Sequence, residues 1–428
     1  MAEVPRNELW MVGGAIAVGL LLRLIYLYSI RHVRLGGDEL EYNLEGRLAA
    51  SGHWLWSTTP YGNPHPTLQK APLYPAWVGL WYSILGVHPD RVEAVQTLFG
   101  PVNIVLSWLL ARRLFGARAG LVAAWIVALD PPMFQWETRL YSESIATPLI
   151  VLFLVVVLER RPTPRRAAAA GVILGLNLLD RPMSVFLVVG LAAAWWLGAG
   201  LRRGSAFLAL SLGVGALVVA PWTIRNYVID GRFVPISAQD AVALAGTFNS
   251  QSAHNPKYPY GWEPLPSSLH NIYFRSHPVN DAEFRSLLLS RGRHYIEAHP
   301  LSLFAAFWFN GITRLWEIRS PGQALDEIKP VPGRTYVPTL IGLCIYYVIF
   351  ALALVSLWRH RHRRALVTPV LALALGLSLA VTPDSGTRYR ITLEPLIAVL
   401  ACGAVPSLTT APLRAKGRLG APRLAARS

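Results

Sequence analysis

The chain has 428 residues, of which 53% are hydrophobic and 15% are charged. Soluble domains carry about a quarter charged residues, so this composition excludes an ordinary soluble protein and indicates a chain that mostly contacts lipid or a buried interior. The formal net charge of +16 could suit nucleic acid, but the positive residues lie in short loops between apolar runs, which is the cytoplasmic Lys/Arg bias of membrane proteins and excludes nucleic acid as a partner.

Twelve apolar runs follow one another along the chain, and several are long enough to cross about 30 Å of hydrocarbon as helices. They lie at residues 9–30, 73–87, 92–111, 119–137, 143–158, 167–180, 183–200, 205–223, 301–316, 337–357, 366–382 and 391–408. The first contains Arg23 and lacks a small-residue cleavage site, so we expect a retained span and not a signal peptide.

Cys344 and Cys402 lie inside apolar runs and are expected to be small core residues, without a disulfide or a thiolate metal site.

Clusters of arginine between these runs predict how the chain is threaded through the membrane. They are Arg112-Arg113 with Arg118, Arg160-Arg161 with Arg165-Arg166, Arg202-Arg203, Arg359 to Arg364, and the tail from Arg414 onward. If all twelve runs crossed, the early clusters would lie outside, against the positive-inside rule. If 73–87 and 301–316 do not cross fully, every cluster and both termini are cytoplasmic.

These two runs are also poor spans. The first has about fifteen residues, with Pro72 just before it and Pro75 near its start. The second is interrupted by Asn310 and Arg314. Segments this short are more often interfacial or re-entrant. We therefore predict an all-α integral membrane protein, a polytopic helical bundle of about ten crossings plus two interfacial helices, with a small irregular outer-face loop region.

Two long polar segments, 31–91 and 224–336, then lie on the outer side. We expect four parts: an N-terminal transmembrane catalytic module at 1–223 with the first outer loop at 31–91, an outer-face loop region with an interfacial helix at 224–336, C-terminal transmembrane helices at 337–410, and a basic cytoplasmic tail at 411–428. Segment 224–336 looks too poor in apolar periodicity to build its own core. Within it, Asn280 to Glu283 predicts a capped helix start, with the helix running to about Glu297.

Three acids, Asp38, Glu39 and Glu41, open the first outer loop directly after Gly36 and Gly37. They could simply form a solvated helix start, where the helix dipole favours acids. Alternatively, Asp38 takes a proton from an attacking hydroxyl at the membrane surface, a task that partial burial favours because it raises a carboxylate's affinity for a proton. The two glycines would allow a tight turn or a close approach to a ligand.

Lys70 closes the same loop, and Glu143 begins a span after the outer link Glu137 to Ser142. Lys70 is either an anchor that extends to the interface or a point charge that contacts a departing lipid phosphate. Glu143 is either a helix-capping acid or an acid with a functional role. Charges so close to hydrocarbon are costly unless they are paired or functional.

Several arginines lie at outer membrane edges, where the positive-inside rule does not predict them. Together they imply an anionic partner at the headgroup level, although any single one could pair with Asp180, Asp384 or lipid headgroups. They are Arg139, Arg181, Arg225, Arg388 and Arg390.

A metal site is a further possibility, formed by His53, His65 and Asp38, although their spacing matches no tight ligand pattern. A divalent metal therefore stays possible, and no other cofactor is predicted. We find no phosphate-binding Gly-rich loop, no Ser-His-Asp signature and no nucleotide fold in the sequence.

Taken in order, the motifs of the chain resemble those of the polytopic glycosyltransferases with a C-type fold, which include bacterial protein O-mannosyltransferase-like enzymes and the lipid A aminoarabinose transferase. The resemblance extends to about residue 400. It runs through G-D-E-L-E-Y-N-L-E-G-R-L-A-A-S-G (37–52), K-A-P-L-Y-P (70–75), R-R-L-F-G-A-R-A-G (112–120), Y-S-E-S (141–144), A-P-W-T-I-R-N-Y (220–227), G-R-F-V-P-I-S (231–237) and R-Y-R-I-T-L-E-P (388–395). Each motif alone is weakly specific, whereas their order and spacing are specific for the superfamily but not for a substrate.

This resemblance implies a role for five residues. Asp38 matches the family's first-loop catalytic acid, the general base, and Glu39 matches a recurrent second acid. Lys70 and Arg388 match donor phosphate-binding positions, and Glu143 matches a second outer-loop acid, where many relatives have Asp. The implied partners are a polyprenyl-phosphate-linked sugar donor, an acceptor protein, lipid or glycan, and membrane lipids.

The implied reaction is inverting transfer of the sugar to an acceptor hydroxyl at the extracytoplasmic side of the plasma (inner) membrane. Two other classes stay open. A transporter or flippase of an anionic lipid would use the same arginines without chemistry, and it predicts charges in mid-span, where only Arg23 is clear. A membrane scaffold would explain the helices and the charge bias but not Asp38, Lys70 and Glu143 together.

Overall fold

The computed structural model describes residues 4–58, 64–269, 280–326, 331, 333–384 and 386–409. Regular structure in these residues is almost entirely helical. The one sheet found there is a two-stranded antiparallel ribbon in the first outer loop, in which β1 (Trp56–Ser57) pairs with β2 (His65–Pro66). The predicted basic tail at 411–428 lies outside the described residues.

Every apolar run predicted from the sequence is helical. In chain order the runs form α1 (Arg6–Ser29), α3 (Leu73–Leu85), α4 (Pro89–Gln96) with α5 (Phe99–Phe115), α6 (Ala117–Leu129) with α7 (Pro131–Glu137), α8 (Glu143–Val157), α9 (Pro164–Asp180), η1 (Pro182–Phe186) with α10 (Leu187–Ala199), α11 (Leu201–Asp230), α16 (Ser302–Ala306) with η2 (Phe307–Arg314), α18 (Tyr336–Arg359), α19 (Arg364–Val381), and α20 (Arg388–Ile391) with α21 (Glu394–Cys402) and η3 (Pro406–Leu408). The outer loops add α2 (Asp38–Ala50), α12 (Gln239–Thr247), α13 (Ser250–Ala253), α15 (Asp281–Ala298) and α17 (Pro321–Asp326).

Six helical segments among the described residues are long and apolar enough to cross a membrane: α1, α4 with α5, η1 with α10, α11, α18 and α19. The pair α6 and α7 is a seventh candidate, bent by 55°. The bend falls at Pro131 and Pro132, which cannot donate the backbone hydrogen bonds that would continue α6. The chain is thus a multi-pass helical membrane protein. The predicted total of about ten crossings would also need α8, α9 and α21, which are shorter, and it stays a prediction.

The long helices pack closely around a core of large apolar side chains. Phe153 of α8, Trp195 of α10 and Leu373 of α19 are almost completely buried in that core. Between α9 and α11, a Cβ at Gly171 would collide with the backbone oxygen of Ser211, so a glycine is required for this close helix contact.

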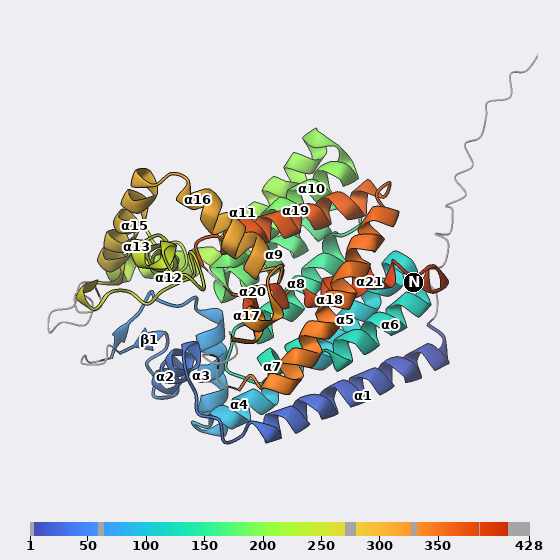
Figure 1. Ribbon diagram of the computed structural model, residues 1–428, viewed down its shortest axis with the longest axis horizontal. Helices are drawn as coiled ribbons and strands as arrows, with labels where there is room; N and C mark the ends of the chain where they lie inside the picture. The colour runs from blue at the N-terminus through green and yellow to red at the C-terminus, as the bar shows by residue number, and fades with distance from the viewer. Residues whose placement is uncertain are drawn as a thin grey trace, which may run out of the picture.

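The two runs predicted not to cross fully are not among the spanning candidates. α3 has 13 residues and packs against α2. Figure 1 shows α2, α3, β1, α12, α13 and α15 gathered at one end of the molecule, beyond the bundle formed by α5, α6, α18 and α21. In η2, Asn310 donates hydrogen bonds to the carbonyls of Tyr260 and Thr382, which ties this helix to the outer segment. Their position at the membrane interface stays a prediction.

The structure corrects one expectation about segment 224–336, because the segment builds a small core of its own, where α12 packs on α15. Because two of the contacting residues on α12 are alanines, a search for large periodic apolar residues misses this contact. The buried members of this core are Ala241, Ala245, Leu269, Phe284 and Leu288. α11 continues past residue 223 to Asp230, and the division of the chain into four parts stays a prediction.

The helix predicted from Asn280 onward is confirmed as α15. The Asn280 side chain accepts a hydrogen bond from the backbone N–H of Glu283 at 2.8 Å, which satisfies one of the free donors at the helix start. The helix ends at Ala298, one residue beyond the predicted end.

Candidate active site

Asp38 is the first residue of α2 and lies between two cations. Gly37, just before it, has a φ of 55°, which is a left-handed conformation that favours glycine. The Asp38 carboxylate accepts hydrogen bonds from Lys70 Nζ at 3.0 Å and from an Arg388 guanidinium nitrogen at 2.6 Å. Its side chain is 23% exposed, so a molecule in the adjoining cavity can reach it.

Lys70 lies deep in the site, with a side chain that is 4% exposed. Its ammonium group pairs with Glu41 at 2.7 Å as well as with Asp38, and it lies over the ring of Tyr42 at 5.2 Å. Such burial is incompatible with an anchor that extends into solvent. Lys70 lines neither of the two cavities described below, so its contact with the site runs through Asp38, and its role at the donor phosphate stays a prediction.

Residues 67–69, just before Lys70, are fixed by the outer helix α15. Asp281, in the first turn of α15, accepts hydrogen bonds from the Thr67 hydroxyl at 3.0 Å, the Leu68 N–H at 2.6 Å and the Gln69 amide at 3.0 Å. Arg225 of α11 donates to the Thr67 carbonyl at 2.7 Å. We call residues 67–69 the strap. Through it, the position of Lys70 depends on an element more than 200 residues away.

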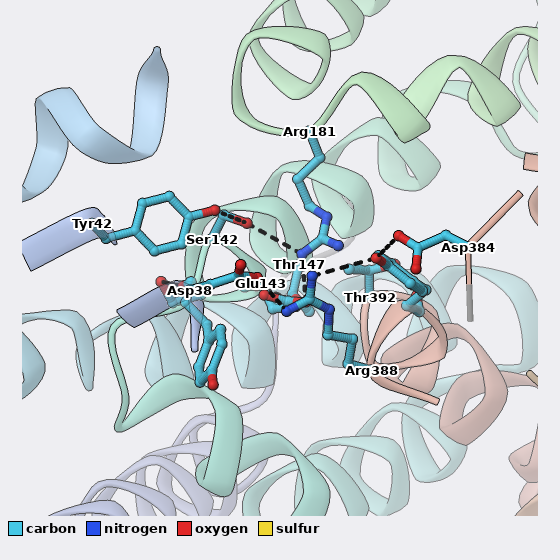
Figure 2. Close-up of polar contacts among 12 residues, drawn as sticks. Asp38, Tyr42, Ser142, Glu143, Thr147, Arg181, Asp384, Arg388 and Thr392 are labelled. Carbon is cyan, nitrogen blue, oxygen red and sulfur yellow. Dashed lines mark hydrogen bonds and ion pairs between the residues drawn. The ribbon is translucent and has the colours of Figure 1, made fainter. Parts of the chain in front are cut away.

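Glu143 lies between two arginines that come from separate parts of the chain (Figure 2). It forms an ion pair with Arg181, which follows α9, and lies 3.6 Å from Arg388 Nε. Arg181 also donates to the Ser142 hydroxyl at 3.2 Å, and that hydroxyl accepts from Tyr42 at 3.5 Å. Arg388 thus connects the Asp38 and Glu143 carboxylates.

The electrostatics of this cluster keep Asp38 and Lys70 charged. Burial alone would raise the pKa of Asp38, but the charges of Lys70 and Arg388 outweigh burial and hold the pKa well below its ordinary value. Burial lowers the pKa of Lys70, whereas Asp38 and Glu41 raise it, and the net pKa is well above its ordinary value. The Asp38 carboxylate is therefore held in its ionised form between two cations.

Glu39 occupies a different environment from Asp38. It is completely buried and accepts two hydrogen bonds from Arg139, at 2.5 and 2.6 Å. Burial raises its pKa, and the contact with Arg139 offsets that rise only in part. In the described part of the chain Glu39 lines neither of the two cavities near Asp38.

The outer-edge arginines divide into two groups. Arg181 and Arg388 reach the cluster around Asp38. Arg225 donates to backbone carbonyls of the first outer loop, and Arg390 of α20 pairs with Glu394, the first residue of α21, at 2.9 Å. The second group therefore stabilises the fold.

The first cavity has a volume of about 440 Å³ and contains Asp38 and Arg388 in its wall. Five aromatic side chains also line it, which gives flat apolar surfaces next to polar groups. They are Trp136, Tyr141, Tyr258, Trp262 and Tyr389.

The second cavity, of about 250 Å³, lies next to the first, and the two share Arg388, Tyr389, Asp384, Gln239 and Ala243 in their walls. Its lining combines polar residues with a set of apolar ones. The polar residues include Tyr42, Ser142, Asp180, Arg181 and Ser237, and the apolar residues include Pro182, Met183, Val185, Ala380 and Pro383. Arg388 therefore stands at the junction of a cavity that contains Asp38 and a cavity that contains Arg181.

Part of this site was not predicted from the sequence. Asp180 was expected only as a partner for an arginine, and the aromatic residues of the first cavity were not expected to line a site. The available signals were the Asp180-Arg181 pair at the outer end of an apolar run and the aromatic residues between 254 and 266.

The suggested metal site is not formed. His53 contacts the Ser51 hydroxyl at 3.2 Å and packs against Trp56. Within the described ranges, no three His, Cys, Asp or Glu side chains are arranged to hold a metal ion, and Asp38 is held by cations instead of histidines.

Comparisons with known proteins identify the class. Residues 69–224 match the family model described as dolichyl-phosphate-mannose-protein mannosyltransferase. The archaeal oligosaccharyltransferase AglB from Archaeoglobus fulgidus, in complex with an inhibitory peptide and a dolichol-phosphate, is similar to 93% of this chain with a TM-score of 0.55 at 15% identity. An Archaeoglobus fulgidus oligosaccharyltransferase in the apo form gives a TM-score of 0.53 at 16% identity, again over 93% of the chain. In each case the chain spans about half the length of the archaeal protein, 50%.

ArnT from Cupriavidus metallidurans bound to undecaprenyl phosphate matches 89% of this chain and 78% of its own length, at 16% identity and a TM-score of 0.42. The comparison with curated protein sequences found no match. From the fold and the family match, the protein is a polytopic membrane protein with the C-type glycosyltransferase fold. More narrowly, its residues 69–224, which carry Lys70, Glu143 and Arg181, are similar to the dolichyl-phosphate-mannose-protein mannosyltransferases, and the resemblance noted in the sequence is confirmed.

Proposed function

We propose that the protein is a glycosyltransferase that moves a sugar from a polyprenyl-phosphate donor to an acceptor hydroxyl, with inversion, at the outer face of the membrane. One observation carries the proposal: a carboxylate, Asp38, is held by two cations, Lys70 and Arg388, where two cavities meet. A hydroxyl that attacks a sugar needs a base, and a leaving phosphate needs positive charge. The cluster has both.

The donor binds in the second cavity. Arg181 and Arg388 supply the charge for its phosphate, and Met183, Val185 and Ala380 offer apolar contacts to the first units of its polyprenyl tail. Val185 is 54% exposed on η1, so the tail can leave toward lipid there. The archaeal oligosaccharyltransferase with a dolichol-phosphate supports this class of donor.

The acceptor hydroxyl enters through the first cavity and is deprotonated by Asp38. The acceptor oxygen forms a bond to the anomeric carbon, the bond from that carbon to the phosphate oxygen breaks, and the polyprenyl phosphate leaves with the electron pair. Lys70 and Arg388 offset the charge that develops on the phosphate, and the proton stays on Asp38 until solvent removes it. The aromatic walls of this cavity suit an acceptor with extended apolar faces, whether a protein, a lipid or a glycan.

Donor binding also activates the base. Without donor, Lys70 and Arg388 hold the pKa of Asp38 well below its ordinary value, and such a carboxylate is a poor proton acceptor. A donor phosphate competes for the same cations and weakens their hold on Asp38. The pKa of Asp38 then rises at the moment when a proton must be taken up, because burial is the opposing influence.

A transporter is less well supported. Arg23, the charge expected in mid-span, is completely buried and paired with Glu137, which also accepts a hydrogen bond from Asn103 at 2.7 Å. These contacts hold α1, α5 and α7 together and offer no free charge to a moving substrate. Asp130 is likewise buried, at the bend between α6 and α7.

The test is sugar transfer by the purified protein in lipid nanodiscs. Polyprenyl-phosphate mannose, glucose, galactose and arabinose would be supplied with a mixture of acceptor peptides, lipids and glycans, and released polyprenyl phosphate would be measured. We expect release that needs an acceptor and that falls at least 100-fold in Arg388→Met. Movement of intact donor across a liposome membrane without release would instead favour the transporter.

A further inference from the structure

The second cavity contains buried polar atoms that the reaction described above does not use. Asp180, the last residue of α9, is 3% exposed and Ser237 is 5% exposed. Within the described part of the chain, neither carboxylate oxygen of Asp180 has a hydrogen-bond partner, and the Ser237 hydroxyl has none either. Both side chains line the second cavity.

Burial without a partner is costly for a hydroxyl and more so for a carboxyl group, and native proteins avoid it except where a ligand or a functional need accounts for it. Arg181, next in sequence, does not satisfy Asp180, because its guanidinium group pairs with Glu143 and Ser142. Two orphaned oxygen-bearing side chains in one cavity therefore point to a ligand that brings its own hydrogen-bond donors.

The surroundings restrict the chemistry of that ligand. A second anionic group beside Asp180 would be repelled, so a phosphate belongs near Arg181 and Arg388. Tyr42 and Ser142 are already bonded to each other at 3.5 Å, so they compete little for added donors. A cavity of about 250 Å³ is slightly smaller than the roughly 300–1,000 Å³ of typical ligand pockets, which restricts the group held there to a small one. An uncharged ring with several hydroxyls suits the acceptor oxygens.

We propose that Asp180 and Ser237 form the sugar-recognition subsite of the second cavity, where they bind ring hydroxyls of the polyprenyl-phosphate-linked sugar. This inference rests on the proposed function and deepens it. Asp180 accepts hydrogen bonds from one or two ring hydroxyls, and the Ser237 hydroxyl forms one further hydrogen bond with the ring. Sites built to hydrogen-bond a hydroxyl discriminate strongly against an analogue that lacks it, because the buried group is then left unpaired.

The experiment compares binding of two lipids to the full-length protein in nanodiscs: polyprenyl-phosphate mannose (with the glucose, galactose and arabinose forms alongside) and bare polyprenyl phosphate. For Asp180→Asn we expect the affinity for the best sugar-bearing lipid to fall roughly 10- to 100-fold, the loss expected when hydrogen bonds to a buried polar group are no longer made. Affinity for bare polyprenyl phosphate stays within about threefold. Ser237→Ala gives a smaller loss with the same selectivity, and Asp90→Asn, an exposed aspartate on α4, changes neither affinity.

A second readout separates recognition from folding. Asn replaces a buried carboxyl group that has no hydrogen-bond partner with an amide of the same shape, so the melting temperature of the free Asp180→Asn protein stays close to that of wild type. An equal loss of affinity for both lipids, or a lower melting temperature with no selective loss, would overturn the subsite and leave the glycosyltransferase proposal standing. Failure of the wild-type protein to bind either lipid would contradict the proposed function and this inference together.

Discussion

Asp38 shares its carboxylate between Lys70 and Arg388, and under the proposed mechanism this arrangement would let a strongly acidic group act as a base. In the free protein the two cations stabilise the ionised form. The same cations are the groups that a donor phosphate would bind. The site is thus self-neutralised when empty, which limits the cost of burying Lys70 and Arg388, and it becomes reactive when the donor replaces Asp38 as their partner.

Glu39, adjacent to Asp38, is expected to act through the fold. Glu39→Gln leaves Arg139 buried without its carboxylate, and breaking a buried pair in this way costs roughly 3–5 kcal/mol. We expect a clearly lower melting temperature in detergent. Glu41→Gln removes a carboxylate that is 58% exposed and should lower stability by about 1 kcal/mol at most.

If Glu39→Gln kept the wild-type melting temperature and still lost transfer, Glu39 would be a catalytic acid, as its place in the first-loop motif implied.

Glu45 gives a pH dependence of stability. It is buried on α2, and burial raises its pKa to about 8, against an ordinary value of 4.5. Between about 4.5 and about 8 the unfolded chain is ionised at this position while the folded chain stays protonated, so stability decreases as pH rises through that window. We expect the melting temperature of wild type to fall from pH 5 to pH 8 more steeply than that of Glu45→Gln. Parallel melting curves for the two proteins would show that Glu45 ionises normally.

At the residue scale, charges next to apolar runs, which are costly, and the family resemblance together predicted Asp38, Lys70, Glu143 and Arg388. The structure brings these four side chains together, and their roles stay predictions. The sequence could not tell Asp38 from Glu39. Adjacent residues at a helix start point in different directions, and the decisive partners, Lys70 and Arg139, come from other parts of the chain.

At the element scale, the strap and α15 form one unit that positions Lys70. Asp281 supplies three hydrogen bonds to residues 67–69, and its loss frees the strap. For Asp281→Ala we expect the KM for the donor to rise roughly 10-fold with a smaller change in kcat, because a misplaced Lys70 weakens phosphate binding before it affects proton transfer. Steady-state transfer assays measure both constants.

Asn280→Ala is the matched control, because it removes the helix cap next to Asp281. It should cost about 1 kcal/mol of stability and leave KM unchanged. An equal rise of KM in both variants would assign the effect to α15 as a whole and not to the strap.

The helices themselves were predictable because apolar runs of sufficient length dictate helix in a membrane. The outer segment was harder. Its core depends on Ala241 and Ala245 of α12 against Phe284 and Leu288 of α15, and alanine carries little periodic signal. The continuation of α11 to Asp230 was missed for a similar reason, since polar residues at the end of a span do not break a helix.

At the scale of the whole molecule, the proposed function requires the site to face the extracytoplasmic side of the membrane and the arginine clusters to face the cytoplasm. Single cysteines would be introduced at Glu297 of α15, 62% exposed, and at Arg361, exposed between α18 and α19. The background would be a Cys344→Ser, Cys402→Ser variant. In intact cells a membrane-impermeant maleimide should label the cysteine at 297 and not the one at 361. The reverse pattern would invert the topology.

The central claim is that Asp38 is the base of a glycosyl transfer, and single-turnover transfer by Asp38→Asn tests it most directly. The variant would be loaded with the polyprenyl-phosphate sugar that wild type uses best, with Asp90→Asn as the matched control. We predict that transfer falls by roughly 100- to 10,000-fold while donor affinity is retained or increased, because Lys70 and Arg388 no longer have Asp38 as a competing partner. Transfer at the wild-type rate by Asp38→Asn, with donor bound, would contradict the account.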